Sequence, residues 1–221
     1  MTEENNQPIS LPRIGDKAPN FEVNTTQGPI KLEDYKGKWL VLFSHPADFT
    51  PVCTTELVAF QDIYPELREL NTELLGLSID STQSHIAWIR NMEENFNTKI
   101  EFPVIADLSK EVAIKYGMIH PEDEGTQANR AVFVIDDNQV VQTIIYYPLT
   151  TGRNMDEIVR VVKALQATSN HQVSTPANWT PGDKVLVPPP GTQQAADERS
   201  GSDDEDIEII DWYLAKKELK E

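Results

Sequence analysis

Residues 38–57, KWLVLFSHPADFTPVCTTEL, predict a buried strand that leads directly into a helix. Its first part contains the unbroken apolar run WLVLF, which begins shortly after Gly37 and ends before a His-Pro pair. Such a run is typical of a strand covered on both faces. Thr50 is a favoured residue at a helix N-cap, and Pro51 is favoured at the first helical position. The stretch therefore favours an α/β fold.

The predicted helix begins at about Val52 and has one apolar face. Apolar residues recur along it at helical spacing, and Pro65 then kinks or ends it. The residues on this face are Cys53, Leu57, Phe60 and Tyr64. Cys53, the only cysteine in the chain, thus falls within the first helical turn.

Strand and helix patterns alternate along the rest of the first 167 residues. Buried strands are predicted at 74–80 and 102–107, and helices at 81–96, at 108–117 (closed by Gly117) and at 154–165. The apolar face predicted for helix 81–96 consists of Ile86, Ile89, Met92 and Phe96. In residues 130–147, two β-branched runs flank Asp136-Asp137-Asn138, which predicts an antiparallel hairpin. The predicted fold class is α/β, with a mixed central sheet flanked by helices.

The composition changes after residue 167, which predicts a boundary there. A chain of 221 residues suits one ordinary domain with an appendage. Residues 197–211 contain eight acids and one arginine, and such a tract buries little surface by itself. The overlapping run IEIIDWYLAKKEL, residues 207–219, is too apolar for an idle tail. We therefore predict a domain at 1–167 and a C-terminal extension at 168–221. We expect this extension to be an arm that packs on another protein surface, and a second copy of the chain is one candidate.

The composition argues against several classes of partner. A formal net charge of −17 repels nucleic acid and anionic lipid, and no apolar run approaches the roughly 18 residues of a membrane span. The acidic start MTEENNQPIS lacks the features of a signal peptide, so we expect a cytoplasmic protein. The four histidines, at positions 45, 85, 120 and 171, lie at no ligand spacing, so we expect no metal site.

The position of Cys53 leaves two interpretations open. Free cysteines are often buried and inert. A helix N-terminus, however, favours the thiolate form, which is the reactive one. Thr50 lies one turn away and can donate a hydrogen bond there, and Arg130 is a candidate for a fixed positive charge beside the sulfur. From the residues alone, Cys53 is either a core residue or a nucleophile.

The stretch FSHPADFTPVCTTEL resembles the active-site signature of peroxiredoxins, whose pattern Pro-x-x-x-Thr-x-x-Cys falls here on Pro46, Thr50 and Cys53. It is similar in particular to the one-cysteine, peroxiredoxin 6-like subfamily. The resemblance covers nearly the whole chain, including the segments 15–28, 77–89, 128–136 and 146–166. It implies a thioredoxin-like fold with a C-terminal extension that reaches across a dimer.

The resemblance also implies roles for individual residues. Cys53 corresponds to the peroxidatic cysteine, Pro46 to the proline that shields it, and Arg130 to the arginine beside it. Residues matching the family's substrate-binding positions are Arg130, Thr50, His45 and Arg153. Residues matching positions that line the pocket are His45, Phe49, Trp88 and Tyr147.

The activity implied by the resemblance is that of a thiol-dependent peroxidase. It reduces hydrogen peroxide and organic hydroperoxides to water and alcohols through a sulfenic acid on Cys53, in antioxidant defence and redox homeostasis, without a cofactor. An external thiol, either a small thiol or a thioredoxin- or glutaredoxin-type protein, then reduces the sulfenic acid. The resemblance implies a homodimer, with a decamer as the larger alternative.

Two departures from the family pattern narrow this expectation. Ala215, in DWYLA, stands where many relatives carry a further cysteine, so no resolving cysteine exists. Lys38 stands where animal relatives carry a phospholipase serine, so we expect no phospholipase activity. Two alternatives are a peroxide sensor or holdase chaperone switched by oxidation of Cys53, and a binding module with an inert thiol. The joint presence of Thr50, Pro46 and Arg130 counts against the inert thiol.

Overall fold

The computed structural model describes residues 11–119, 125–202 and 204–219. The chain divides into two compact units, Met1–Met155 and Asp156–Glu221. Residues 1–10, for which the sequence predicts no signal peptide, lie outside the described residues. Within the described ranges, no helix combines the length and the apolar composition needed to cross a bilayer.

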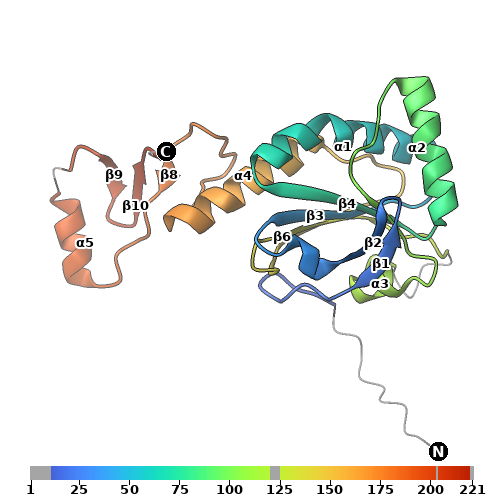
Figure 1. Ribbon diagram of the computed structural model, residues 1–221. Coiled ribbons are helices and arrows are strands. Elements are labelled where there is room, and N and C mark those ends of the chain that lie inside the picture. Colours follow the sequence, from blue (N-terminus) through green and yellow to red (C-terminus); the bar gives the residue numbers. More distant parts are fainter. Residues whose placement is uncertain (1–10, 120–124, 203, 220–221) are drawn as a thin grey trace, which may run out of the picture. The chain divides into compact units, whose positions relative to one another are not determined.

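A seven-stranded mixed sheet forms the centre of the first unit (Figure 1). Its strand order is β2-β1-β5-β4-β3-β6-β7, in which β3, β4 and β5 are parallel and the other pairings are antiparallel. The strands are β1 (Glu22–Thr25), β2 (Gly28–Lys31), β3 (Trp39–Ser44), β4 (Thr72–Ser78), β5 (Val104–Ala106), β6 (Arg130–Ile135) and β7 (Val141–Tyr147). The predicted mixed sheet is confirmed, as is the hairpin, which is β6 and β7.

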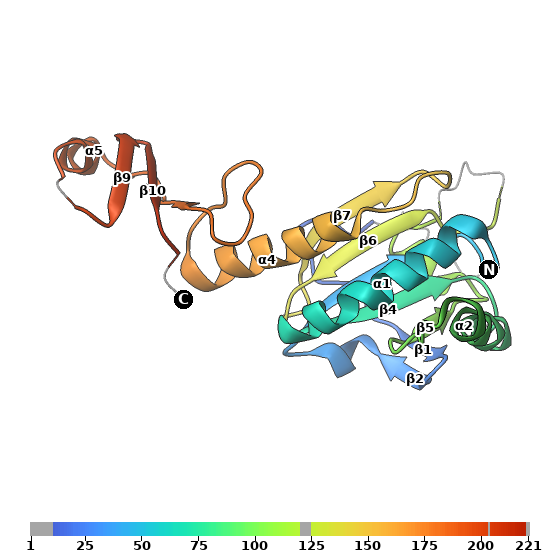
Figure 2. The ribbon, with the colours of Figure 1, turned by 90° about the horizontal axis from the view of Figure 1, so that it is seen from above.

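Helices cover both faces of this sheet. Helices α1 (Pro51–Glu69) and α2 (Thr82–Phe96) lie on one side, while the short α3 (Glu111–Lys115) lies on the other (Figures 1 and 2). A 3-10 turn, η1 (Leu32–Tyr35), follows β2. Strand β3 contributes to both layers: Phe43 stacks on Phe60 of α1, whereas Leu42 belongs to the cluster that includes residues of α3. Burial on both faces explains the unbroken apolar run of β3.

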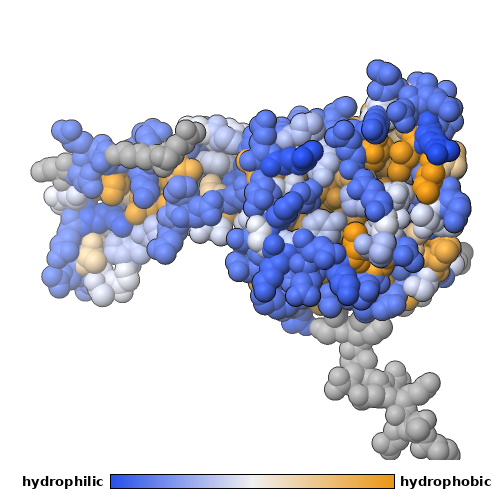
Figure 3. All heavy atoms as spheres, in the orientation of Figure 1, coloured by the Kyte–Doolittle hydropathy of each residue, from blue (hydrophilic) through white to orange (hydrophobic). Residues whose placement is uncertain are grey.

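The surface of the chain is far more polar than its interior. Most of the face seen in Figure 3 is hydrophilic, with apolar side chains exposed only in places. The apolar residues of β3 and β6 are buried throughout. Burial of this apolar surface is the main favourable contribution to folding of the first unit.

The structure corrects three details predicted from the sequence. Of the two outcomes predicted at Pro65, a kink or an end, the end is wrong: α1 continues to Glu69, because Leu67 beyond the proline is fully buried and packing holds the last turn. The helix predicted at 108–117 is only α3, although Gly117 does take the positive φ (67°) of a helix-ending glycine. The hairpin of β1 and β2 was not predicted, because four-residue, half-exposed strands carry almost no periodicity.

The buried face of α2 also differs from the prediction. Phe96 is 53% exposed and Ile86 is exposed as well, whereas the buried residues are His85, Trp88 and Met92. Of the predicted face, Met92 is buried and Ile89 is partly buried, so the prediction is only partly correct; it missed His85 because a histidine was not counted as a core residue. Ser81 caps α2, since its side chain accepts a hydrogen bond from the backbone of Ser84.

The second unit consists of a long helix and a small sheet. The helix predicted at 154–165 is the longer α4 (Met155–His171), so the boundary predicted after residue 167 falls inside it, and this domain division remains a prediction. The three-stranded sheet has the order β8-β10-β9. Its elements are β8 (Val185–Leu186), β9 (Ile207–Asp211) and β10 (Leu214–Lys217), with α5 (Gln193–Ser200) between β8 and β9. The hydrophobic core of the second unit consists of Ala164, Ala167, Val173, Trp179 and Val185.

Candidate active site

Cys53 lies where the sequence placed it, in the first turn of α1. Thr50 is the N-cap residue with an extended backbone, and Pro51 is the first helical residue. The Thr50 hydroxyl makes no capping bond and instead donates to the backbone oxygen of Ala47 (2.9 Å). The side chain of Cys53 has no exposed surface. The loop 45–50 joins β3 to this helix at the carboxyl edge of the parallel strands, where ligands of α/β sheets commonly bind.

Arg130 reaches Cys53 from the other side of the site. It begins β6, and its Nη1 lies 3.3 Å from the Cys53 sulfur. Its Nε and Nη2 donate to the backbone oxygen of Leu149 at 3.0 and 2.8 Å, which fixes the plane of the guanidinium. The buried sulfur therefore has a buried cation as its neighbour.

Glu56, which the sequence analysis did not single out, links the two arginines of the site. It accepts from Nη1 of Arg130 (2.6 Å) and from Nη2 of Arg153 (2.7 Å), and its other oxygen accepts from the backbone N and Nε of Arg153, both at 2.9 Å. Arg153 also donates to the backbone oxygens of Ser44 and Ala131. Burial lowers the pKa of Arg153, and the charge of Glu56 opposes this.

These contacts define what each arginine does in the site. Two guanidinium groups and one carboxylate leave one net positive charge beside Cys53. Arg153 is connected to Arg130 through Glu56, which accepts hydrogen bonds from both arginines. The sequence did hold a signal for Glu56: an acid on the otherwise apolar face of a helix, one turn after the cysteine.

The residues predicted to line a pocket differ in exposure. Phe49 is 58% exposed, has a left-handed backbone (φ 54°), and its ring centroid lies 6.3 Å from that of Trp88. Trp88 is buried, and its Nε1 donates to the Thr54 hydroxyl at 3.2 Å. Pro46 is buried in the loop. Tyr147 is partly exposed and pairs with Arg130 between β6 and β7.

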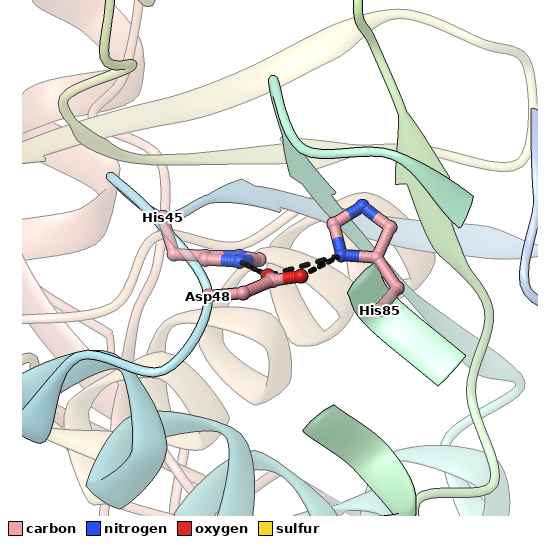
Figure 4. A group of neighbouring side chains, drawn as sticks. All are labelled: His45, Asp48 and His85. Atoms are coloured by element: carbon pink, nitrogen blue, oxygen red, sulfur yellow. Dashed lines mark hydrogen bonds and ion pairs between the residues drawn. The ribbon is translucent and has the colours of Figure 1, made fainter. Parts of the chain in front are cut away.

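His45 belongs to a buried cluster that sequence spacing did not indicate. Figure 4 shows the Asp48 carboxylate between the rings of His45 and His85. His45 Nε2 lies 3.0 Å from Asp48 Oδ1, and His85 Nδ1 lies 3.0 and 2.8 Å from Oδ1 and Oδ2. Both rings are fully buried. Of the other two histidines, His171 ends α4 and residue 120 lies outside the described residues.

Hydrogen bonding sets the charge state of this cluster. Burial raises the pKa of Asp48, but the hydrogen bonds from His45 and His85 outweigh it and lower the pKa to about 2. Burial lowers the pKa of His45, which keeps its ring neutral at neutral pH. The donor set is one that transition metals use, but the three side chains here hydrogen-bond one another. In the described part of the chain, Nδ1 of His45 has no hydrogen-bond partner.

Comparisons with known proteins find two matching family models and several similar relatives. A model of the AhpC/TSA family matches residues 14–144, and a model of the C-terminal domain of 1-Cys peroxiredoxin matches residues 164–202. A peroxiredoxin of Methanosarcina mazei is 54% identical over 94% of this chain and 98% of its own length. A peroxiredoxin of Aquifex aeolicus is 52% identical over 96% and 99%.

Solved structures of peroxiredoxins are also similar to this chain. Yeast mitochondrial 1-Cys peroxiredoxin is similar with a TM-score of 0.82 and 40% identity, over 94% of this chain and 99% of that one. Peroxiredoxin 6 of Arenicola marina, in a mutant form, gives a TM-score of 0.82 and 33% identity, over 95% and 99%.

The fold and the buried thiol therefore define a thiol-dependent peroxidase of thioredoxin-like fold. The chain belongs to the peroxiredoxin family. Its single cysteine fits the one-cysteine mechanism, which needs a thiol from another molecule. The fold, enzyme class and family predicted from the sequence are thereby confirmed.

Proposed function

We propose that Cys53 is the residue that attacks the peroxide and that Arg130 is its fixed cation. The observation that carries this proposal is the 3.3 Å contact between Arg130 Nη1 and the sulfur of the only cysteine. The thiolate attacks the terminal oxygen of the peroxide, and the O–O bond breaks. One oxygen stays on sulfur as sulfenic acid, and the other leaves as hydroxide or alkoxide and takes up a proton. The substrates are hydrogen peroxide and organic hydroperoxides.

The other residues of the site contribute to binding and to charge stabilisation. Arg130 donates to the oxygen on which negative charge develops, which stabilises the transition state. Thr50 contacts the peroxide through its hydroxyl. While this hydroxyl donates to Ala47, it offers the peroxide an acceptor. Pro46, His45 and Arg153 complete the site, and Phe49, Trp88 and Tyr147 form its walls. Because Cys53 has no exposed surface, these walls must move apart for a peroxide to enter.

An external thiol closes the cycle. It condenses with the sulfenic acid to form a mixed disulfide and water, and a second thiol then releases reduced Cys53. The yeast mitochondrial relative resolves its thiol via glutathione and thioredoxin systems. We propose a small thiol or a thioredoxin- or glutaredoxin-type protein for this chain. A dependence on thiols suits a reducing compartment such as the cytoplasm.

Trapping the intermediate tests this proposal. After one equivalent of hydrogen peroxide, we expect a single dimedone adduct on the peptide that contains Cys53, measured by mass spectrometry. Addition of glutathione or reduced thioredoxin should prevent the adduct and support repeated turnover. An unmodified Cys53 contradicts the proposed role of this residue. Oxidation without repeated turnover favours the alternative of a peroxide sensor or holdase chaperone.

We also propose that residues 168–221 form an arm that joins two copies of the chain into a homodimer, with a decamer as the larger assembly. The support is apolar surface at the tip of the small sheet, where Ile210, Trp212 and Tyr213 are 53, 44 and 55% exposed. Burying a large apolar side chain contributes about 1.5–3 kcal/mol. Three such side chains can hold a partner despite the nearby acids.

Deleting residues 201–221 should therefore weaken the dimer and make Cys53 accessible to bulky thiol reagents. Light scattering measures the assembly, and the rate of alkylation by a bulky maleimide measures access. The milder pair Trp212→Ser and Tyr213→Ser should have the same effect in smaller degree. Phe96→Ser, which removes an equally exposed aromatic ring from α2, is the matched control. Unchanged assembly and unchanged access in the truncated chain contradict the proposed arm.

A further inference from the structure

The loop 45–50 is held from the side by α2. His85 of α2 contacts both carboxylate oxygens of Asp48, and Asp48 Oδ1 in turn contacts His45 at the end of β3. All three side chains are almost completely out of contact with solvent. A buried carboxylate that bridges two imidazoles is strongly directional, because charge-assisted hydrogen bonds are short and an unpaired buried charge is costly.

The same helix also holds the far end of the loop. Trp88 lies three residues after His85 on α2. Its Nε1 donates to the Thr54 hydroxyl (3.2 Å), and that hydroxyl donates to the backbone oxygen of Thr50 (2.8 Å). Helix α2 thus holds both ends of the segment that leads from His45 to Cys53. Of the three buried residues of α2, His85 bonds directly to this segment and Trp88 bonds to Thr54, the residue that follows it. An ordinary amphipathic helix would place aliphatic side chains there.

Protons in this cluster have a defined arrangement. Both nitrogens of His85 face acceptors, since Nε2 lies 3.1 Å from the backbone oxygen of Ile105. Neutral His45 donates to Asp48 through Nε2 and therefore carries no proton on Nδ1. Asp48 thus fixes both the position of the His45 ring and its tautomer. Its backbone N is held separately, by Asp80 Oδ2 at 3.0 Å.

We propose that Asp48 and His85 are positioning residues of the peroxidase reaction. Together they hold the loop 45–50 so that Pro46 and Thr50 keep their places around the Cys53 sulfur when a peroxide enters. The inference rests on Cys53 as the reacting thiol. Its effect falls on the peroxide step, which needs the loop, and much less on the nucleophilicity of the sulfur, which depends on Arg130 and the helix N-terminus.

Three substitutions of His85 separate its two hydrogen bonds. His85→Asn keeps a donor near the position of Nδ1 and so keeps the bond to Asp48. His85→Gln keeps a donor near the position of Nε2, which faces Ile105, and loses the bond to Asp48. His85→Leu loses both. If the hydrogen bond to Asp48 is the one that supports peroxide reduction, the Asn variant should oxidise like the wild type and the Gln variant like the Leu variant.

Two rate constants are measured for each variant. One is oxidation of Cys53 by hydrogen peroxide, and the other is its alkylation by iodoacetamide, which needs only the nucleophile. For the Leu and Gln variants we expect oxidation to fall about 10- to 100-fold, since misplacement by about 1 Å can cost that much, with alkylation changed by less than about threefold. For the Asn variant we expect both rates to stay within about threefold of wild type. Asp48→Asn should show the same selective loss as the Leu variant.

Several outcomes overturn the inference. An unchanged oxidation rate in the Leu and Gln variants does so, as does an equal fall in both rates, which is what a purely structural role produces. Equal loss in the Asn and Gln variants also contradicts it, and this comparison decides the matter even if the Leu variant does not fold. Circular dichroism checks the fold of each variant. Failure of wild-type Cys53 to react with peroxide would instead contradict the proposed function.

Discussion

Cys53→Ser should abolish peroxide reduction while leaving the fold intact. No other thiol exists in the chain, and a serine hydroxyl is a much weaker nucleophile at neutral pH. The expected loss is about a thousandfold or more, as when other enzymes lose their catalytic nucleophile. Peroxide consumption in the presence of excess thiol measures the activity.

The fold should survive because serine differs from cysteine by one atom and stays within reach of Arg130. Circular dichroism and thermal unfolding check this. A second control is Thr55→Ser, a comparably small change on the exposed part of the same helical turn, which should retain full activity. Peroxidase activity of Cys53→Ser close to that of the wild type would refute the assignment of the nucleophile.

The second large effect is expected for Arg130→Met. This change removes the cation beside the sulfur and the donor for the departing oxygen, and it leaves Glu56 with Arg153 as its only remaining guanidinium partner. Loss of one donor to a developing oxyanion typically costs about 100- to 1,000-fold in rate. The measurement is the rate constant for Cys53 oxidation by hydrogen peroxide, over a range of pH.

Arg130→Lys is the informative companion. Lysine keeps the positive charge but cannot bridge the sulfur, Glu56 and the Leu149 oxygen at once, because it lacks the planar fork of donors. We expect it to recover part of the lost rate. A Met variant that oxidises as fast as the wild type would show that the helix N-terminus alone activates Cys53.

Local patterns were enough to predict β3, α1 and the β6–β7 hairpin. The apolar run of β3, the Thr50-Pro51 start of α1 and the turn residues of the hairpin each follow from neighbouring residues alone. The family resemblance then supplied what these patterns could not, namely which of the possible partners lies beside Cys53. Arg130 is 77 residues away, and the antiparallel pairing of β3 with β6 brings the start of β6 to the end of β3.

In the site, the residues that escaped prediction are polar residues buried through mutual bonds. Hydrophobic spacing cannot place His85 in a core, because its burial depends on Asp48 from a different element. Glu56 escaped for the same reason, since an acid next to a helix start usually faces solvent and here faces two arginines. Such clusters arise from tertiary structure, and one of them contacts the Cys53 sulfur through Arg130.

The positive charge beside Cys53 also bears on how the enzyme is inactivated by over-oxidation. Sulfenic acid that meets a second peroxide before it meets a thiol becomes sulfinic acid, which thiols do not reverse. A sulfinate is an anion, and the group of Arg130, Glu56 and Arg153 carries one net positive charge to hold it. The chain has no second cysteine to capture the sulfenic acid first. The extent of inactivation therefore depends on whether an external thiol or a second peroxide reacts with the sulfenic acid first. The working life of each molecule is therefore set by the ratio of reductant to peroxide around it.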